Sequence, residues 1–140
     1  MPHTKAPLET LAACPLFEGL QKKQLRRLRD EFKDADFKPG ATIITEGQKG
    51  GRFFLVIEGK VTVSVRGKQK SVLGPGDCFG EWALVDGGVR TATITADTEV
   101  QALTLAPWTF KAMLLGEPDM MFRILQQTVR RYREMSAEVV

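Results

Sequence analysis

The 140-residue chain has one histidine, two cysteines and one tyrosine, and these scarcities exclude several kinds of chemistry. A metal enzyme built on a β-roll needs several histidines that converge on one ion. The lone His3 stands near the start of the chain and cannot supply such a cluster. Cys14 and Cys78 have no histidine partner that would activate a thiol nucleophile. We therefore expect a non-catalytic protein without a cofactor or metal, and two buried thiols rather than a disulfide or a metal pair.

The chain also lacks long apolar runs and a strong excess of one charge. No stretch approaches the ~18 apolar residues of a membrane span, and residues 1–5 lack the apolar core of a secretory signal. The net charge is +3, yet residues 40–105 hold seven acids and seven bases. The excess bases lie near both ends of the chain and are typical of solvated helix faces, without groove-reading elements beside them. We predict a cytoplasmic protein with no membrane partner and no direct nucleic acid partner.

Hydrophobic periodicity changes twice along the chain. Helical patterns occupy residues 8–13 and 21–32, and in the second of these Leu25, Leu28 and Phe32 form one buried stripe. Strand patterns with a period of two follow, separated by glycine and proline turns. They cover residues 42–45, 53–57, 61–65, 91–95 and 100–105. In the third of these segments valines alternate with polar residues, which predicts one buried and one solvated face.

After Pro107 the pattern becomes helical again. Two helices are predicted, at residues 108–115 and 118–135. The longer helix carries a stripe that we expect to pack on the β-roll, formed by Met121, Leu125, Thr128, Tyr132 and Met135. We expect no helix-turn-helix unit after this helix, because only five residues follow it in the sequence.

About eight short strands, with turns every eight to twelve residues, predict a mainly β protein with flanking helices. The expected architecture is an eight-stranded β-roll or jelly roll at residues 35–105. N-terminal helices at 1–34 and two C-terminal helices at 107–135 would flank it. The length and the 43% hydrophobic content fit a single compact domain with one core.

Residues 79–96 combine three features that suit a sugar phosphate. Gly80 has no Cβ, so its backbone can approach a ligand, and the run after it can open a short helix whose free N–H groups favour an anion. Arg90 supplies a permanent charge and a planar fork of donors for phosphate oxygens. The Glu81 carboxylate can accept a hydrogen bond from a hydroxyl. From the residues alone, Arg90 could equally pair with Glu81 or Asp86, and Glu81 could cap the helix.

The same segment resembles the phosphate-binding cassette of cyclic nucleotide-binding domains. These domains occur in regulatory subunits of cyclic-AMP-dependent protein kinase, in cyclic-nucleotide-gated channels and in the bacterial catabolite activator. Residues 79–85 read FGEWALV and residues 89–94 read VRTATI, against a family pattern of FGE[LI]ALL, a turn and PR[TSA]A[TS][VI]. Trp82 replaces the usual Leu or Ile, and Val89 replaces the common Pro. Turns at residues 37–40, 46–47, 57–59 and 73–77 resemble the family's turns in the same order, so the resemblance covers nearly the whole chain.

The resemblance implies a role for each cassette residue, beginning with Phe79 and Gly80 at its start. Arg90 would bind the phosphate, and Glu81 would accept from the ribose 2′-hydroxyl. The main-chain N–H groups of Trp82 and Ala83 would donate to the exocyclic oxygens. The hydroxyl of the residue after the arginine, Thr91, would hydrogen-bond to the phosphate or to a purine amino group, a feature often associated in the family with cyclic GMP. The Trp82 ring either packs beneath the cassette or stands beside the ligand.

Further implied contacts come from outside the cassette. Val63, Leu73 and Phe79 would form an apolar wall for the base, although ordinary core packing explains them equally. The long C-terminal helix would act as a lid, in which Arg131 and Tyr132 cover the purine by cation–π contact or stacking. Plain helix packing is the alternative role for Tyr132.

These features predict a sensor of 3′,5′-cyclic purine nucleotides that comprises residues 1–140, with cyclic AMP as the expected ligand. The alternatives are a preference for cyclic GMP, and a docking module that kept the roll but lost the ligand. Closure of the C-terminal helix would shift the balance between the open and closed conformations of the domain. A separate effector protein can recognise this change. A homodimer through the C-terminal helices is a further prediction.

Overall fold

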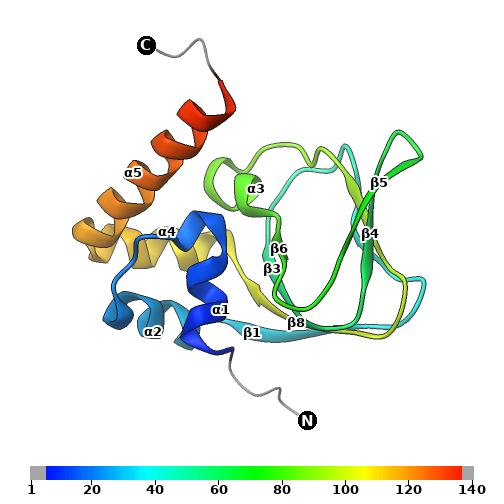
Figure 1. Cartoon of the computed structure of the whole chain (residues 1–140), viewed down its shortest axis with the longest axis horizontal. Coiled ribbons are helices and arrows are strands. Elements are labelled where there is room, and N and C mark those ends of the chain that lie inside the picture. The colour runs from blue at the N-terminus through cyan, green and yellow to red at the C-terminus, as the bar shows by residue number, and fades with distance from the viewer. Residues whose placement is uncertain (1–5, 137–140) are drawn as a thin grey trace.

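The computed structural model describes residues 6–136, so the expectations for His3 and for the N-terminal segment 1–5 lie outside the described residues. The helices are α1 (Leu8–Ala13), the 3₁₀-helix η1 (Pro15–Phe17), α2 (Lys22–Asp30), α3 (Glu81–Asp86), α4 (Pro107–Gly116) and α5 (Pro118–Met135). The strands are β1 (Lys33–Phe37), β2 (Thr42–Ile44), β3 (Phe53–Glu58), β4 (Val61–Val65), β5 (Lys68–Leu73), β6 (Cys78–Phe79), β7 (Thr93–Ala96) and β8 (Val100–Leu105). Except for α3, the helices gather at one end of the strands (Figure 1).

Two four-stranded antiparallel sheets form the roll. The first has the strand order β1-β8-β3-β6 and the second β2-β7-β4-β5. In the first sheet β8 lies between β1 and β3, with Phe53 opposite Leu105. In the second sheet β7 joins β2 to β4, with Ile44 opposite Ile94. Eight strands in two sheets with flanking helices confirm the predicted fold class.

Strand β3 separates two hydrophobic clusters. Phe53 and Leu55 are fully buried on the side that the helices cover, whereas Phe54 and Val56 are buried inside the roll. This alternation is the two-residue period of an extended strand. We call the first group the helix-side cluster, which contains Cys14, Leu16, Phe17, Leu25, Leu28, Phe53, Leu55, Met120 and Ile124 among others. The second group, the roll cluster, contains Ile44, Phe54, Val56, Val61, Phe79, Ile94, Ala96, Val100 and Ala102.

The helix-side cluster confirms the stripe predicted for the second N-terminal helix. Leu25 and Leu28 are buried in it, and Phe32 packs against it. The Phe32 ring meets Phe53 edge-on, with ring centroids 6.0 Å apart. An amphipathic stripe at helical spacing therefore fixes α2 to the outer face of the first sheet.

The alternation predicted for residues 61–65 is weaker than expected. Val61 is fully buried, but Val63, Val65 and the polar residues between them are all half-buried. Val63 borders a cavity, described below, which explains why its side chain keeps some exposure.

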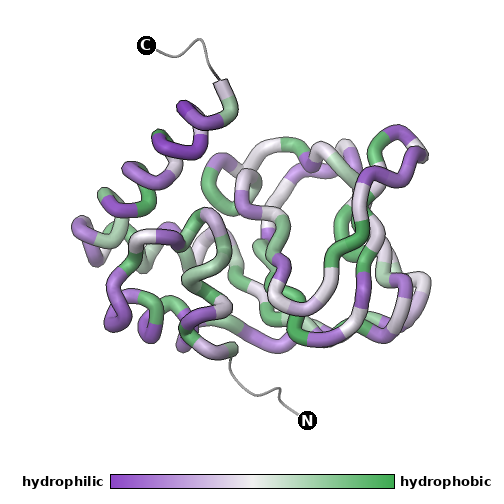
Figure 2. The backbone as a smooth tube through the Cα atoms, viewed as in Figure 1, coloured by the Kyte–Doolittle hydropathy of each residue, from purple (hydrophilic) through white to green (hydrophobic). Residues whose placement is uncertain are grey.

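The prediction for the buried face of α5 is wrong. Leu125 is 54% exposed and Tyr132 60% exposed, whereas Met120, Ile124 and Gln127 are buried. The helix packs against η1 and α4 rather than against the strands, and its second half rises away from them (Figure 1). Hydrophobic residues recur along its length among hydrophilic ones (Figure 2). The buried stripe is thus displaced by one residue, about 100° around the helix, from the predicted one.

A membrane-spanning helix is not found in the described part of the chain, where every helix is too short or too polar to cross a bilayer.

Candidate functional site

A cavity of about 410 Å³ opens where α3 and the loop after it meet the second sheet. This volume lies in the range of small-molecule sites. Eight of the eleven predicted site residues line it: Val63, Phe79, Gly80, Glu81, Trp82, Ala83, Arg90 and Thr91. The fold thus brings residues from β4, β6, α3 and the segment before β7 to a single cavity.

Gly80 stands at the start of α3 in a conformation that other residues rarely adopt. Its φ is 88° and its ψ 11°, in the left-handed region. A Cβ at this position would lie 2.6 Å from the Arg52 carbonyl oxygen and 3.0 Å from Nη1 of Arg90. Glycine is therefore required twice, by backbone conformation and by space.

Arg90 is the half-buried cation of the cavity. Its Nη2 donates to the Arg52 carbonyl oxygen at 2.7 Å, and its backbone is held by Gln48 and Gly47 on the neighbouring turn. Burial lowers the pKa of the guanidinium. No carboxylate among residues 6–136 forms an ion pair with Arg90, so the pairing with Glu81 or Asp86 considered from the sequence is not formed. A half-buried cation without a counter-ion favours an anionic ligand, because the anion would offset the cost of desolvation.

Glu81 pairs with α5 instead. Its Oε1 accepts from Nη2 of Arg131 at 3.2 Å, and the two side chains are only 17% and 25% exposed. Arg131 is thereby held beside the cavity, although it does not line it. Because a carboxylate has two oxygens, Oε2 stays available for a hydroxyl donor.

The floor of the cavity is apolar. Phe79 is 7% exposed and stacks on Phe54, with ring centroids 5.2 Å apart and planes inclined by 23°. Ile44 and Ile94, paired across β2 and β7, complete this floor. Both isoleucines lie in segments that were predicted as strands, but the strand periodicity carried no signal that a cavity opens there.

Other lining residues were not assigned to the site from the sequence. They are Cys78, Asp86, Gly88, Val89 and Ala92. Asp86 Oδ1 accepts from the Gly88 N–H at 2.7 Å and so shapes the glycine turn before the arginine. The DGG triplet is a turn signal that could have indicated this contact.

Two predicted contact residues lie apart from the cavity. Leu73 ends β5 and packs against the roll cluster, and Tyr132 is 60% exposed on α5. Neither lines the cavity. Trp82 lines it with 60% of its surface exposed, so its ring is not packed beneath the cassette.

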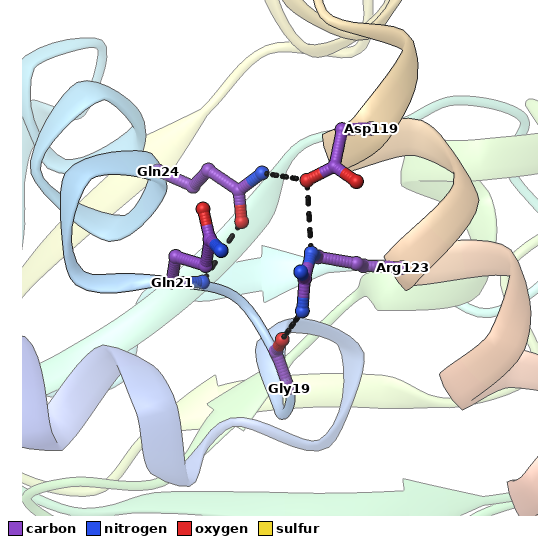
Figure 3. Close-up of polar contacts among 5 residues, drawn as sticks. All are labelled: Gly19, Gln21, Gln24, Asp119 and Arg123. Atoms are coloured by element: carbon purple, nitrogen blue, oxygen red, sulfur yellow. Dashed lines mark hydrogen bonds and ion pairs between the residues drawn. The ribbon is translucent and has the colours of Figure 1, made fainter.

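A polar cluster holds the first half of α5 on the N-terminal helices (Figure 3). Asp119 Oδ2 accepts from Nε2 of the buried Gln24 at 2.8 Å and from Nε of Arg123 at 2.9 Å. Arg123 also donates to the Gly19 carbonyl oxygen at 3.3 Å. The hydrogen bonds from Arg123 and Gln24 lower the pKa of Asp119.

Further along the helix, Gln127 donates to Glu18 at 3.2 Å. The first half of α5 is therefore anchored, and within residues 6–136 only Arg131 hydrogen-bonds its second half to α3.

Comparison with known proteins identifies the family of the domain. The sequence profile of the cyclic nucleotide-binding domain matches residues 35–117, which contain the whole cavity. The chain belongs to this family. Cyclic nucleotide-binding domains are regulatory and non-catalytic, and the family binds cyclic AMP as a regulatory ligand, with no cofactor indicated.

Three relatives illustrate the relationship. A CRP-like cAMP-activated global transcriptional regulator of Mycobacterium tuberculosis is 31% identical over an alignment of 130 residues, which covers 89% of this chain and 58% of that protein. The N-terminal domain of a Streptomyces coelicolor transcriptional regulator superposes with a TM-score of 0.85 at 33% identity, over 94% of this chain and 97% of that one. The regulatory domain of Toxoplasma gondii PKA, solved with cAMP, superposes with a TM-score of 0.68 at 29% identity, over 76% and 42%. The chain thus spans less than two thirds of the curated relative.

Proposed function

We propose that this domain is a non-catalytic sensor whose cavity binds a 3′,5′-cyclic purine nucleotide, with cyclic AMP as the preferred ligand. The observation that carries the proposal is Arg90, a half-buried guanidinium at the cavity without a carboxylate partner among the described residues. A cyclic phosphate diester carries one negative charge and two exocyclic oxygens, which suit the guanidinium fork.

The start of α3 supplies the second group of contacts. The left-handed Gly80 turns the first N–H groups of the helix toward the cavity, so those of Trp82 and Ala83 donate to the phosphate oxygens. Glu81 accepts from the ribose 2′-hydroxyl through Oε2, because Oε1 is engaged by Arg131. Phosphate and sugar are thereby bound by adjacent residues.

The base extends along the apolar side of the cavity. Val63 and Phe79 contact it there, and Leu73 supports the wall from β5. α5 serves as the lid: its second half closes toward α3 and brings Arg131 and Tyr132 over the purine. This movement is the conformational signal, since the first half of the helix is anchored to the N-terminal helices.

The relatives favour cyclic AMP as the ligand. One is named as cAMP-activated, and another was solved with cAMP. Cyclic GMP is the alternative, and the Thr91 hydroxyl is the group that would accept a hydrogen bond from the amino group of its base. A docking module without a ligand is the remaining alternative.

Calorimetric titration of nucleotide-free protein with cyclic AMP and cyclic GMP tests the proposal. Wild-type protein is expected to bind cyclic AMP with micromolar or tighter affinity and at least about tenfold more tightly than cyclic GMP, a difference of ~1.4 kcal/mol. Arg90→Leu is expected to abolish binding, whereas the exposed Arg26→Leu should leave it unchanged. If folded, empty protein binds neither nucleotide, the docking module becomes the better explanation.

We further propose that two copies associate through α5. Six apolar side chains, each at least 36% exposed, line one side of the helix: Met121, Phe122, Leu125, Val129, Tyr132 and Met135. This surface, which we call the α5 stripe, differs from the face that carries Arg131 and the buried Ile124. A two-fold axis would place two such stripes against each other, which is the self-complementary contact of a homodimer. Lid movement and dimerisation can therefore use different faces of the same helix.

The output is read by an effector protein in the cytoplasm. The proposed domain comprises the N-terminal segment 1–34, the roll at 35–105 and the C-terminal helices at 107–135, and the second half of α5 is its moving part. Because one relative is a transcriptional regulator that extends beyond the matched segment, the predicted absence of nucleic acid contact applies to residues 1–140 only.

A further inference from the structure

The two cysteines of the chain lie far apart in sequence, yet the fold brings them together. Cys14 stands between α1 and η1 and is 1% exposed. Cys78 opens β6, opposite Leu55 of β3. Directly opposed residues of an antiparallel pair project to the same face of a sheet, and Leu55 is buried in the helix-side cluster together with Cys14. The register thus places Cys78 on the face of the sheet that the helix-side cluster covers, and Cys78 packs against that cluster, which contains Cys14.

The two thiols are neighbours on the helix-facing side of the first sheet. Cys14 is the first cause of the raised pKa of the Cys78 thiol, and the Cys14 thiol donates to the Thr10 carbonyl oxygen at 3.8 Å. Both thiols are free. A disulfide between them requires the two sulfur atoms to approach to ~2.05 Å.

The position of the pair links it to the nucleotide site. Cys78 lines the cavity and directly precedes Phe79, Gly80 and Glu81. Cys14 begins the η1 segment, after which Glu18 accepts the hydrogen bond from Gln127 of α5. A covalent bond between the thiols would therefore tie the segment that supports the lid helix to the strand that leads into the phosphate cradle.

We propose that Cys14 and Cys78 are a dithiol that low-molecular-weight disulfides oxidise to an intramolecular disulfide, and that this bond weakens nucleotide binding. The effect on binding rests on the proposed function, whereas formation of the bond does not. The crosslink restrains the cradle and the base of α5 relative to each other, so ligand-induced closure meets more resistance.

The reaction balances as two thiol–disulfide exchanges with oxidised glutathione. The Cys78 thiolate, from the more exposed cysteine, attacks one glutathione sulfur, breaks its S–S bond and releases one glutathione thiolate. The Cys14 thiolate then attacks the Cys78 sulfur of the mixed disulfide and releases the second glutathione thiolate. The protein loses two electrons and two protons, and two molecules of reduced glutathione carry them away.

The surroundings of the thiols make this reaction slow at neutral pH. The hydrogen bond to Cys14, burial, the charge of Cys14 and the carboxylates of Glu81 and Asp77 all raise the pKa of the Cys78 thiol above its usual range. Since the thiolate is the reactive form, oxidation is expected to accelerate as pH rises. The pair thus responds to sustained rather than brief exposure to an oxidant.

Incubation of the full, nucleotide-free chain with oxidised glutathione tests the inference. Peptide mapping without reductant is expected to find a linked Cys14–Cys78 peptide, formed faster at pH 9 than at pH 7. The oxidised protein should melt at a higher temperature, because the crosslink constrains the unfolded chain, and should bind cyclic AMP about tenfold more weakly. Dithiothreitol should reverse all three changes. Cys14→Ala, which removes the buried partner, should give only a glutathione adduct at Cys78.

Each possible negative result would contradict a different part of the proposal. If the linked peptide forms in urea-unfolded protein but not in folded protein, the proposal that the two thiols of the folded protein form a disulfide is wrong. A complete crosslink with unchanged affinity would overturn its effect on binding. If reduced protein binds neither nucleotide, the proposed function fails and the effect on binding fails with it, whereas the peptide map still decides whether the bond forms.

Discussion

Arg131 on α5 and Glu81 on α3 form an ion pair of 3.2 Å beside the cavity. Glu81 is the carboxylate expected to bind the ribose, and Arg131 belongs to the helix expected to close over the ligand. A single contact therefore connects α5 to the carboxylate that is proposed to bind the sugar. The first half of the same helix is anchored elsewhere by Asp119 and Gln127, so changes at this pair should alter mainly its second half.

Arg131→Gln is expected to loosen the second half of α5. Because the pair is partly exposed and screened, its coupling energy should be about 1 kcal/mol or less. Hydrogen exchange of residues 128–135 should become faster in Arg131→Gln and in Glu81→Gln, and the double variant should exchange no faster than either. The exposed neighbour Arg130 supplies the control, since Arg130→Gln should leave the exchange rates unchanged. Additive effects of the two substitutions would show that the pair is not coupled.

Gly80→Ala is expected to destabilise the domain and to abolish nucleotide binding. The new Cβ would meet the Arg52 carbonyl oxygen at 2.6 Å in a left-handed conformation. We expect a loss of about 3 kcal/mol in the free energy of unfolding, measured by urea denaturation. Gly87→Ala is a matched control: its φ is 66°, but no heavy atom lies within 4 Å of the added Cβ. It should cost only about 1 kcal/mol, from the conformation alone. Equal losses would mean that close approach to Arg52 is unimportant.

The Asp119 carboxyl group is expected to make the stability of the folded domain depend on pH. Hydrogen bonds from Arg123 and Gln24 lower the pKa of its carboxyl in the folded state. A lowered folded-state pKa stabilises the protein above the unfolded value of about 4, and this contribution is lost as the pH falls through the folded-state pKa. The melting temperature of wild type should exceed that of Asp119→Asn at pH 7, and the difference should shrink below about pH 4. A constant difference across this range would contradict the assignment.

Leu125→Glu is expected to shift the chain from dimer to monomer. The side chain lies in the middle of the α5 stripe and is 54% exposed, so a charge there would be buried between two helices at a cost of several kcal/mol. Analytical ultracentrifugation measures the change. Arg130→Glu, at an exposed position on the opposite side of the helix, should remain dimeric. A wild-type chain that stays monomeric at all accessible concentrations would contradict the proposed interface.

Much of the fold and of the candidate site follows from local patterns. The apolar run at residues 53–57 predicted a strand, and the Leu25–Leu28–Phe32 spacing predicted a helix with one buried stripe, because both periods are properties of the backbone. The segments FGEWALV and VRTATI contain ten of the residues that line the cavity. Here the chain itself brings the donors close together, since a short helix and one glycine turn connect them.

Contacts between residues far apart in the sequence could not be predicted from local patterns. The apolar residues of α5 cover two adjacent stripes, so periodicity alone could not decide which one is buried; η1 and α4 selected Met120 and Ile124. Nothing in the sequence near Cys14 or Cys78 indicated their contact, which depends on the register of β6 against β3. The sequence near Arg131 or Glu81 also did not indicate their ion pair, because that contact depends on the orientation of α5 relative to α3. The sequence by itself determined the elements and the chemistry of the cassette, because these depend on neighbours along the chain. Only the tertiary structure decided which distant groups meet, because packing between elements sets those distances.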